Sequence, residues 1–245
     1  MNIKSEYNGK KITLYRTETT RSTNLDAKAV GKDGALIVAD RQTGGKGRMG
    51  RDFVSEKGGV YMSLFLDIGE NAADTLFLTS AAAVAVSRAL DTMTNESTLI
   101  KWVNDIYLRG KKVCGILAEG VIQAGRMKSA VLGVGVNLVG LYSMPPELEN
   151  KAGFVFESGD FEALREKFIN LFLFNFTALF SGGKKEEIYT EYQKKNYLSG
   201  KTVRFSENGK MLEGKVKGIA PDISLVVLSE SREYRLRFGE AEIKL

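Results

Sequence analysis

Short apolar runs separated by turn residues dominate the first 140 residues of the chain. Runs of this kind are typical of buried or half-buried strands. A strand that starts at Leu99 runs into residues 101–108, and a turn follows at Arg109-Gly110-Lys111. Two stretches, 25–32 and 72–93, are predicted to be helices. The other strands predicted in this part of the chain are 11–16, 35–39, 60–66, 112–121 and 127–139.

The pattern changes after residue 140, where the irregular stretch 140–153 begins. Asp160 is then placed to cap an apolar helix that runs from Phe161 to about Phe180, and a charged helix follows at 184–195. The buried stripe of the apolar helix consists of Leu164, Phe168, Leu171, Phe172 and Leu179, which lie on one face of a helix.

From Lys201 onward only short alternating strands remain, with turns at Asn208-Gly209 and Pro221-Asp222. This texture predicts a small β-barrel. We therefore place a domain boundary near residue 198, with one domain over 1–197 and a small one over 198–245. The predicted fold class is α+β, a mixed β-sheet flanked by helices and followed by the small barrel.

The absence of histidine restricts the chemistry. The 245 residues contain no histidine and a single cysteine, Cys114. Ser-His-Asp and Cys-His catalysis, His-ligated metals, intrachain disulfides and Cys-based zinc sites are excluded. Because Cys114 lies in an apolar strand, we interpret it as a core residue. Carboxylates, lysines, arginines, backbone amides and a hard cation such as Mg²⁺ remain, and they suit phosphoryl or nucleotidyl transfer.

Charge and hydropathy limit the partners. The formal net charge is +5, which permits an acidic partner. Aromatic residues do not alternate with the cations as they do in a platform that stacks nucleic-acid bases, so we expect no DNA. The first 20 residues lack the apolar core of a signal peptide. The longest strictly apolar run, Ala81–Val86, is much shorter than the roughly 20 residues of a membrane span. We therefore expect a cytoplasmic protein.

Residues 41–51, R-Q-T-G-G-K-G-R-M-G-R, form the most distinctive stretch. Four glycines lie among four cations, and the stretch contains no acidic residue. Glycine lets the backbone approach a ligand closely, and cations of this density indicate a carboxylate or phosphate ligand. We predict a lid that closes over such an anion. The alternative is a basic, flexible hairpin loop without a ligand.

The same loop matches the dinucleotide fingerprint G-x-G-x-x-G at Gly45, Gly47 and Gly50. That fingerprint has meaning only between a strand and a helix. Here a turn-rich connector, 53–59, and a buried strand follow instead. We therefore reject a dinucleotide site of this type.

Other polar groups are candidates for the same site. Lys101, Asn104 and Asp105 lie at a strand end, and Lys112 begins the paired strand. Each alone is more typical of a surface charge, but together with the glycine loop they predict a site. Ser22-Thr23-Asn24 either only cap a helix or also face a polar ligand, and the sequence leaves both interpretations open.

Glycines at alternate positions mark one more stretch, the strand segment Gly133-Val134-Gly135-Val136-Asn137. They leave a bare backbone on one face, which usually means that a ligand or a neighbouring chain approaches closely.

These motifs resemble those of biotin protein ligases. Residues 101–119, K-W-V-N-D-I-Y-L-x-x-K-K-V-C-G-I-L-A-E, are similar to the family's K-W-P-N-D…K-x-x-G-I-L motif. The glycine loop with Gln42, the S-T-N at 22–24, the G-V-G-V-N ending at Asn137 and the small C-terminal β domain also match in order. The resemblance covers essentially the whole chain. Two departures stand out: Val103 replaces a proline, and Lys46 replaces an arginine, which keeps charge but loses the planar fork.

The resemblance implies a fold and an activity. The fold would be the class II synthetase-like catalytic fold with an SH3-like C-terminal barrel. The enzyme would be of the monofunctional type, without the DNA-binding domain of the bifunctional members. Biotin would react with ATP to give biotinyl-5′-AMP, and a lysine on the biotin carboxyl carrier domain of an acyl-CoA carboxylase would then take the biotinyl group. Mg²⁺ is the implied cation, and a homodimer is compatible with the resemblance.

The resemblance also implies roles for individual residues. Lys112 would hold the carboxylate and the developing charge, Arg48 would bind phosphate and close the loop, and Asp105 or Asn104 would position Mg²⁺ through water. The implied biotin contacts are Ser22, Thr23, Asn24, Gln42, Gly45, Lys46, Gly47, Arg48, Tyr61, Lys112, Gly115 and Ile116. The implied ATP and adenylate contacts are Arg48, Arg51, Phe53, Lys101, Trp102, Asn104, Lys112 and Asn137.

Two other functions compete with this interpretation. A lipoate or octanoate ligase or transferase shares the fold but lacks this combination of motifs. A non-catalytic basic binding module would bind polyanions with an affinity that falls steeply with salt.

Overall fold

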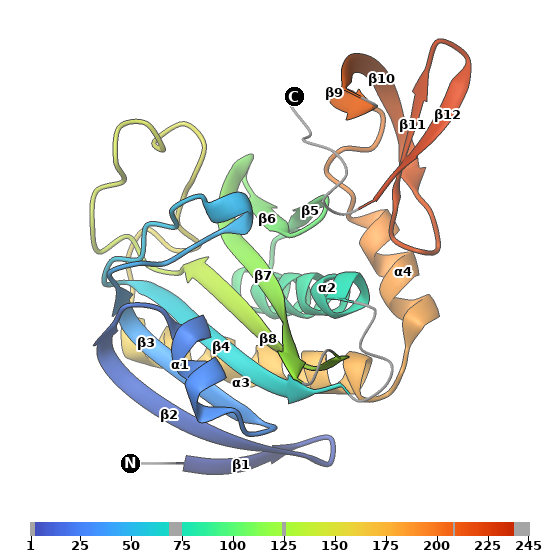
Figure 1. The fold of residues 1–245 in the computed structure, drawn as a ribbon. Coiled ribbons are helices and arrows are strands. Elements are labelled where there is room, and N and C mark those ends of the chain that lie inside the picture. The colour runs from blue at the N-terminus through green and yellow to red at the C-terminus, as the bar shows by residue number, and fades with distance from the viewer. Residues whose placement is uncertain (1–2, 69–74, 124–125, 208, 238–245) are drawn as a thin grey trace.

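Two β-sheets and four α-helices form the protein (Figure 1), in a computed structural model that describes residues 3–68, 75–123, 126–207 and 209–237. The larger sheet has the strand order β1-β2-β3-β4-β8-β7-β6-β5. Its pairs are antiparallel except β2 and β3, which are parallel. The sheet is therefore mixed, as predicted. Its strands are β1 (Ile3–Tyr7), β2 (Lys10–Thr20), β3 (Ala35–Gln42), β4 (Gly59–Asp67), β5 (Leu99–Lys101), β6 (Asp105–Leu108), β7 (Lys111–Gln123) and β8 (Arg126–Asn137).

Helices cover both faces of this sheet. Helix α1 (Thr23–Val30) lies on one face against β3, β4 and β8, whereas α2 (Thr75–Thr94) and α3 (Phe161–Phe180) pack together on the other. The strands are consequently apolar on both sides. Leu36 and Val38 join the main core, whereas Ala35 and Ile37 form a smaller core with Ala27 of α1.

Helix α2 carries most of its apolar residues inside the molecule. Residues 81–86 are completely buried. The segment Leu76–Thr94 is long and apolar enough to cross a bilayer, but 67% of the tested window is buried inside the protein. Burial of this extent is typical of the core helix of a globular fold. Cys114 is also fully buried, which agrees with a core role, and burial raises the pKa of its thiol far above the usual range.

Most predicted elements are present, with shifted ends. Asp160 caps α3 by accepting a hydrogen bond from the Ala163 N–H at 3.2 Å. The prediction for residues 99–108 needs correction, because the chain turns at 102–104 and forms the β5–β6 hairpin instead of continuing as a strand. The start of the helix predicted at 72 falls partly outside the described residues.

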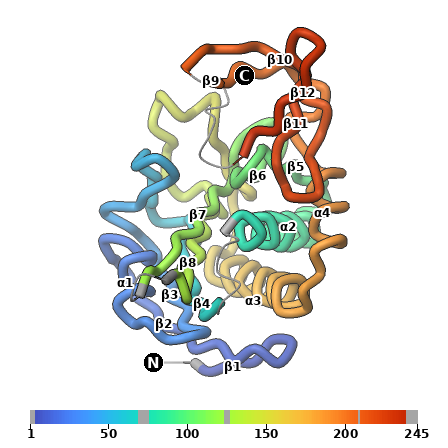
Figure 2. Tube along the Cα trace, turned by 45° about the vertical axis from the view of Figure 1, so that its right-hand side comes forward, coloured from blue at the N-terminus to red at the C-terminus, as the bar shows by residue number. Residues whose placement is uncertain are grey.

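The second sheet is a four-stranded antiparallel meander of order β12-β11-β10-β9. Its strands are β9 (Thr202–Glu207), β10 (Lys210–Ile219), β11 (Leu225–Ser229) and β12 (Arg232–Leu236). It lies beside α4 (Lys185–Lys194) and the β5–β6 hairpin (Figure 2). The Trp102 indole N–H donates to the Ile223 carbonyl oxygen at 2.8 Å, so the hairpin turn is tied to this sheet. Closure into a barrel and the domain boundary near 198 stay predictions.

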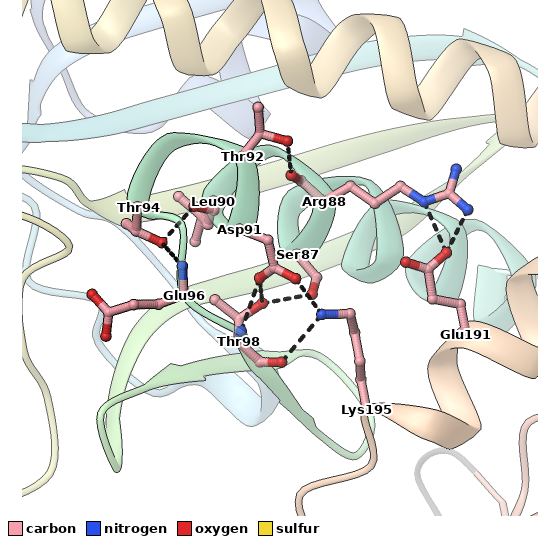
Figure 3. Close-up of polar contacts among 10 residues, drawn as sticks. All are labelled: Ser87, Arg88, Leu90, Asp91, Thr92, Thr94, Glu96, Thr98, Glu191 and Lys195. Carbon is pink, nitrogen blue, oxygen red and sulfur yellow. Dashed lines mark hydrogen bonds and ion pairs between the residues drawn. The ribbon is translucent and has the colours of Figure 1, made fainter.

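A buried polar network anchors the hairpin to α2 (Figure 3). The Asp91 carboxylate accepts hydrogen bonds from the Thr98 N–H at 2.8 Å and its hydroxyl at 2.7 Å. Asp91 also pairs with the largely buried ammonium of Lys195, which follows α4. The Asp91 carboxylate thus fixes the segment that leads into β5, and with it the position of the turn at 102–104 that follows β5.

We predict that Asp91→Ala lowers the free energy of unfolding by about 3 kcal/mol, because it leaves a buried ammonium and the Thr98 donors without their acceptor. Lys184→Ala, which breaks an exposed pair with Glu187, is the control and should cost about 0.5 kcal/mol. Urea unfolding of both variants measures the difference, and equal losses would contradict the anchoring role.

Candidate functional site

A cavity of about 630 Å³ lies along one face of β7 and β8, between α1 and the glycine loop. This volume is in the range of small-molecule sites. Side chains at the start of α1 line one part of it, and the β5–β6 turn with Lys112 lines another. The cavity therefore extends from the start of α1 to the β5–β6 turn.

A bulge in β7 turns Lys112 into the cavity. Cys114 pairs with Ile106 of β6, but Lys112 pairs with the next residue, Tyr107, so Val113 is the extra residue. Simple alternation would put Lys112 and Gly115 on opposite faces of the strand. The bulge instead directs Lys112 to the face of Gly115 and Val113 to the core, and bulges beside active sites often redirect a side chain in this way.

The Lys112 ammonium lies 2.8 Å from the Asp105 Oδ1 atom and 5.9 Å from the centre of the Phe53 ring. Asp105 pairs with Lys101 across the hairpin register. Burial lowers the pKa of Lys101, while the nearby Asp105 carboxylate opposes that shift. Two ammonium groups therefore share the field of one carboxylate, and the region keeps an excess of positive charge for an anion.

The glycine loop is closed against the β5–β6 turn. The Arg48 guanidinium donates to the Asn104 Oδ1 atom at 3.1 Å, and burial lowers the pKa of Arg48. Asn104 also holds β7, since its carbonyl and its amide bond to the Ile116 N–H and C=O at 2.9 and 2.8 Å. These Ile116 backbone groups, which we predicted to contact biotin, are thus engaged within the protein. The preceding Trp102–Val103 peptide bond is cis.

Side chains of this same chain fill the bare glycine face. A Cβ atom on Gly135 would lie 2.7 Å from the Phe53 ring, and one on Gly115 would lie 3.0 Å from it. A Cβ on Gly133 would lie 2.3 Å from the Asn24 Oδ1 atom. We expected a ligand or a second chain at this face. Phe53 and Asn24 approach it instead. The glycines leave room for these two side chains, which in turn line the cavity.

The helix-capping alternative for residues 22–24 can now be tested. Ser22 is the N-cap of α1, but its side chain makes no capping bond, and Thr23 and Asn24 lie inside the helix. The Thr23 N–H donates to the Gln42 Oε1 atom at 2.9 Å, and the Thr23 hydroxyl oxygen lies 3.0 Å from the same atom. The Asn24 amide donates to Glu119 at 2.5 Å. The side chains of Ser22, Thr23 and Asn24 thus line the cavity, and the Ser22 side chain does not cap the helix.

Most predicted site residues line the cavity. Three of them do not. Gly45 is packed against Ser55 and Gln42, Tyr61 is buried with its hydroxyl donating to the Glu56 carbonyl at 2.7 Å, and Asn137 reaches the Gly153 carbonyl. The lining residues among the predicted set are Ser22, Thr23, Asn24, Gln42, Lys46, Gly47, Arg48, Arg51, Phe53, Lys101, Trp102, Asn104, Asp105, Lys112, Gly115 and Ile116.

Sequence reasoning missed several lining residues. Leu117 and Glu119 continue the alternation of Gly115 along β7 and therefore face the same side. That signal was present in the sequence. Met49, which is solvent-exposed and has a positive φ of 56°, lies in the predicted lid but was assigned no contact of its own. The missed lining residues outside the predicted lid and the glycine-rich strand segment are Arg21, Leu25, Asp52, Met62, Leu117 and Glu119. The others are Gly44, Met49 and Gly50 of the predicted lid and Gly133, Val134 and Gly135 of the glycine-rich strand segment.

The described residues contain no cluster of three or more metal-ligating side chains. Asp105 is engaged by Lys112, and Asn104 by Arg48 and Ile116. Mg²⁺ usually takes one or two carboxylates together with substrate phosphates and waters. Asp105 fits one such carboxylate, so the cation would have to arrive with a phosphate ligand.

We predict that Gly135→Ala lowers the free energy of unfolding by about 2 kcal/mol, because the added methyl group overlaps the Phe53 ring. In a Phe53→Ala background the same change should cost less than about 0.5 kcal/mol, since the ring is gone. A double-mutant cycle by urea unfolding measures this coupling. Additive losses would show that the ring does not occupy the glycine face in solution. Gly47→Ala, whose Cβ meets only an ordinary contact at 3.6 Å, is the neutral control.

Comparison with known proteins identifies the family. The model of the Biotin/lipoate A/B protein ligase family matches residues 13–137. This range is half of the chain and contains both the glycine loop and Lys112. The chain belongs to this family.

Individual relatives of this chain are ligases. The bifunctional ligase/repressor BirA of Bacillus subtilis is 37% identical over 139 residues, which are 56% of this chain and 43% of that protein. The biotin--[acetyl-CoA-carboxylase] ligase of Paracoccus denitrificans is 33% identical over 129 residues, 52% of this chain and 54% of that protein. The chain thus matches only about half the length of these curated relatives.

A solved structure matches over more of the chain. The biotin protein ligase of Aquifex aeolicus, in complex with biotin and ATP, superposes with a TM-score of 0.81 at 26% identity and covers 94% of this chain and 98% of its own. The mixed sheet, its helices and a small C-terminal β-sheet are therefore the biotin ligase fold.

Proposed function

We propose that the protein is an ATP-dependent biotin protein ligase. The Lys112 ammonium carries this proposal, because it lines the same cavity as the polar residues of α1 and Arg48 of the cationic loop. The Aquifex relative of the same fold binds biotin and ATP, and the Paracoccus relative is named for transfer to acetyl-CoA carboxylase.

The first half-reaction joins two anions. A biotin carboxylate oxygen attacks the α-phosphorus of ATP, an O–P bond forms, and pyrophosphate leaves with the electrons of the broken P–O bond. Two unit charges 4 Å apart repel by about 4 kcal/mol at an effective dielectric constant of 20. One ammonium at similar distance offsets a term of that size, so Lys112 and Arg48 together cancel the repulsion and stabilise the charge that moves to the phosphate.

The second half-reaction needs no protein nucleophile. A lysine amine of the acceptor attacks the acyl carbonyl of biotinyl-5′-AMP, the acyl C–O bond breaks, and AMP leaves while the amine loses a proton. The closed loop has a physical purpose here, because the mixed anhydride would hydrolyse in open water. The acceptor is the biotin carboxyl carrier domain of an acyl-CoA carboxylase.

Finer features belong to the same proposal. Asp105 would help hold Mg²⁺ that enters with ATP, where the cation supplies charge neutralisation on the phosphates. Of the predicted contacts, Lys101, Arg51 and Phe53 are assigned to the nucleotide, and Ser22, Thr23 and Gln42 to the biotin ring. The implied roles of Gly45, Tyr61 and Asn137 become indirect, through packing. The C-terminal sheet is proposed to be an SH3-like barrel, and the location cytoplasmic.

The second candidate is a lipoate or octanoate ligase of the same fold. The family model includes both types. The polar side chains of Thr23, Asn24 and Gln42 line the end of the cavity, and this polarity suits the ureido ring of biotin better than an alkyl chain or a dithiolane. Biotin is therefore the better match.

ATP–pyrophosphate exchange tests this proposal. We expect exchange with biotin and at most a hundredth of that rate with lipoate or octanoate. Lys112→Ala should slow exchange at least 100-fold, or about 3 kcal/mol, which is typical of removing one partner of transition-state charge. Lys111→Ala, the exposed neighbour on the other side of the strand, should stay within threefold. No stimulation by biotin would overturn the function, and a Lys112→Ala loss below tenfold would remove Lys112 from the reaction centre.

A further inference from the structure

Glu119 lies in the cavity at the end of the 101–119 motif, and the resemblance assigns it no role. It follows Gly115 and Leu117 on the cavity face of β7. Its carboxylate contacts two residues of α1: the Asn24 Nδ2 atom at 2.5 Å and the Lys28 ammonium at 3.1 Å. Glu119 thus joins the floor of the cavity to the helix that lines its polar end.

The chemistry of the carboxylate fixes the orientation of Asn24. An ionised carboxylate only accepts hydrogen bonds. The Asn24 atom that faces Glu119 must therefore be its NH₂ group, and the Oδ1 atom must face the other way, toward the Ser63 hydroxyl at 2.5 Å. The Asn24 side chain is held in this orientation, because it also packs against the Gly133 backbone.

The orientation of Asn24 in turn fixes the hydroxyl protons. Asn24 Oδ1 is an acceptor, so the single Ser63 proton is used there. The hydroxyl oxygens of Ser63 and Thr23 lie 2.7 Å apart, and Ser63 has no second proton to give. A contact of this length needs one proton, so the Thr23 hydroxyl donates to Ser63, and Gln42 Oε1 accepts from the Thr23 N–H at 2.9 Å. Thr23 therefore keeps its proton inside the protein and its lone pairs for the cavity.

We propose that Glu119 is a positioning residue that selects the acid substrate. It makes the polar end of the cavity accept hydrogen bonds, which matches a ligand that carries N–H donors, such as the ureido ring of biotin. Lipoate and octanoate have no donor at that end and would leave the acceptors unpaired, which is the strongest form of discrimination by hydrogen bonding. This inference rests on the proposed ligase function.

The test uses exchange kinetics of the full chain with biotin and with octanoate. Glu119→Leu removes the acceptor, so kcat/KM for biotin should fall about tenfold, the scale of one lost buried hydrogen bond. The ratio of biotin to octanoate rates should fall by the same factor, while KM for ATP changes less than twofold. Glu119→Gln should restore biotin use to within threefold, because its carbonyl oxygen still accepts from Asn24.

Two controls separate the possible results. Lys28→Met keeps the carboxylate and removes only its ion-pair partner, so it should stay within threefold. If Glu119→Leu does not fold, Glu119→Asp gives the same test, because its shorter side chain cannot reach Asn24. A wild-type enzyme that ignores biotin overturns the proposed function and the inference with it. A wild-type enzyme that uses biotin, with Glu119→Leu unchanged or with biotin, octanoate and ATP equally impaired, overturns the inference alone.

Discussion

The ion pair between Lys112 and Asp105 is the interaction on which the site depends. It joins the start of β7 to the start of β6. It also offsets the desolvation cost that an isolated, partly buried ammonium would have. The contact of 2.8 Å with the Asp105 Oδ1 atom also orients the ammonium. Under the proposed function, a substrate carboxylate beside Lys112 would meet an ammonium already oriented, which is the form of electrostatic stabilisation that catalysis needs.

The rest of the cavity follows from a surface that lacks side chains. Gly115, Gly133 and Gly135 leave the backbone of β7 and β8 bare on the face opposite α2. Phe53 from the loop and Asn24 from α1 pack onto that surface, and each brings its segment to the cavity. The glycines therefore have two effects: they let Phe53 and Asn24 pack against the sheet, and they leave room in the cavity for a ligand. Arg48 and Asn104 then close the loop against the β5–β6 turn.

Much of this could be predicted from the sequence, because strands and motifs are local. The apolar runs located β2, β3, β4, β7 and β8, whereas β1 was not predicted and β5 and β6 were predicted as one strand. The glycine loop and Lys112, singled out from the sequence, line one cavity. Three features could not be predicted, because they depend on register and tertiary contacts. The turn at 102–104 interrupts a run of strand-like residues, the bulge at Val113 decides where Lys112 points, and the partners of Asn24 come from strands far away in the chain.

The central claim is that one substrate carboxylate binds beside Lys112 with its ring at the polar end near α1. A crystal structure with biotin and a non-hydrolysable ATP analogue tests it most directly. The account predicts a biotin carboxylate oxygen within about 3 Å of the Lys112 ammonium, with the ureido ring against Thr23 and the phosphates under Arg48. Biotin bound elsewhere, or bound with its ring beside Lys112 and its carboxylate at α1, would contradict the account.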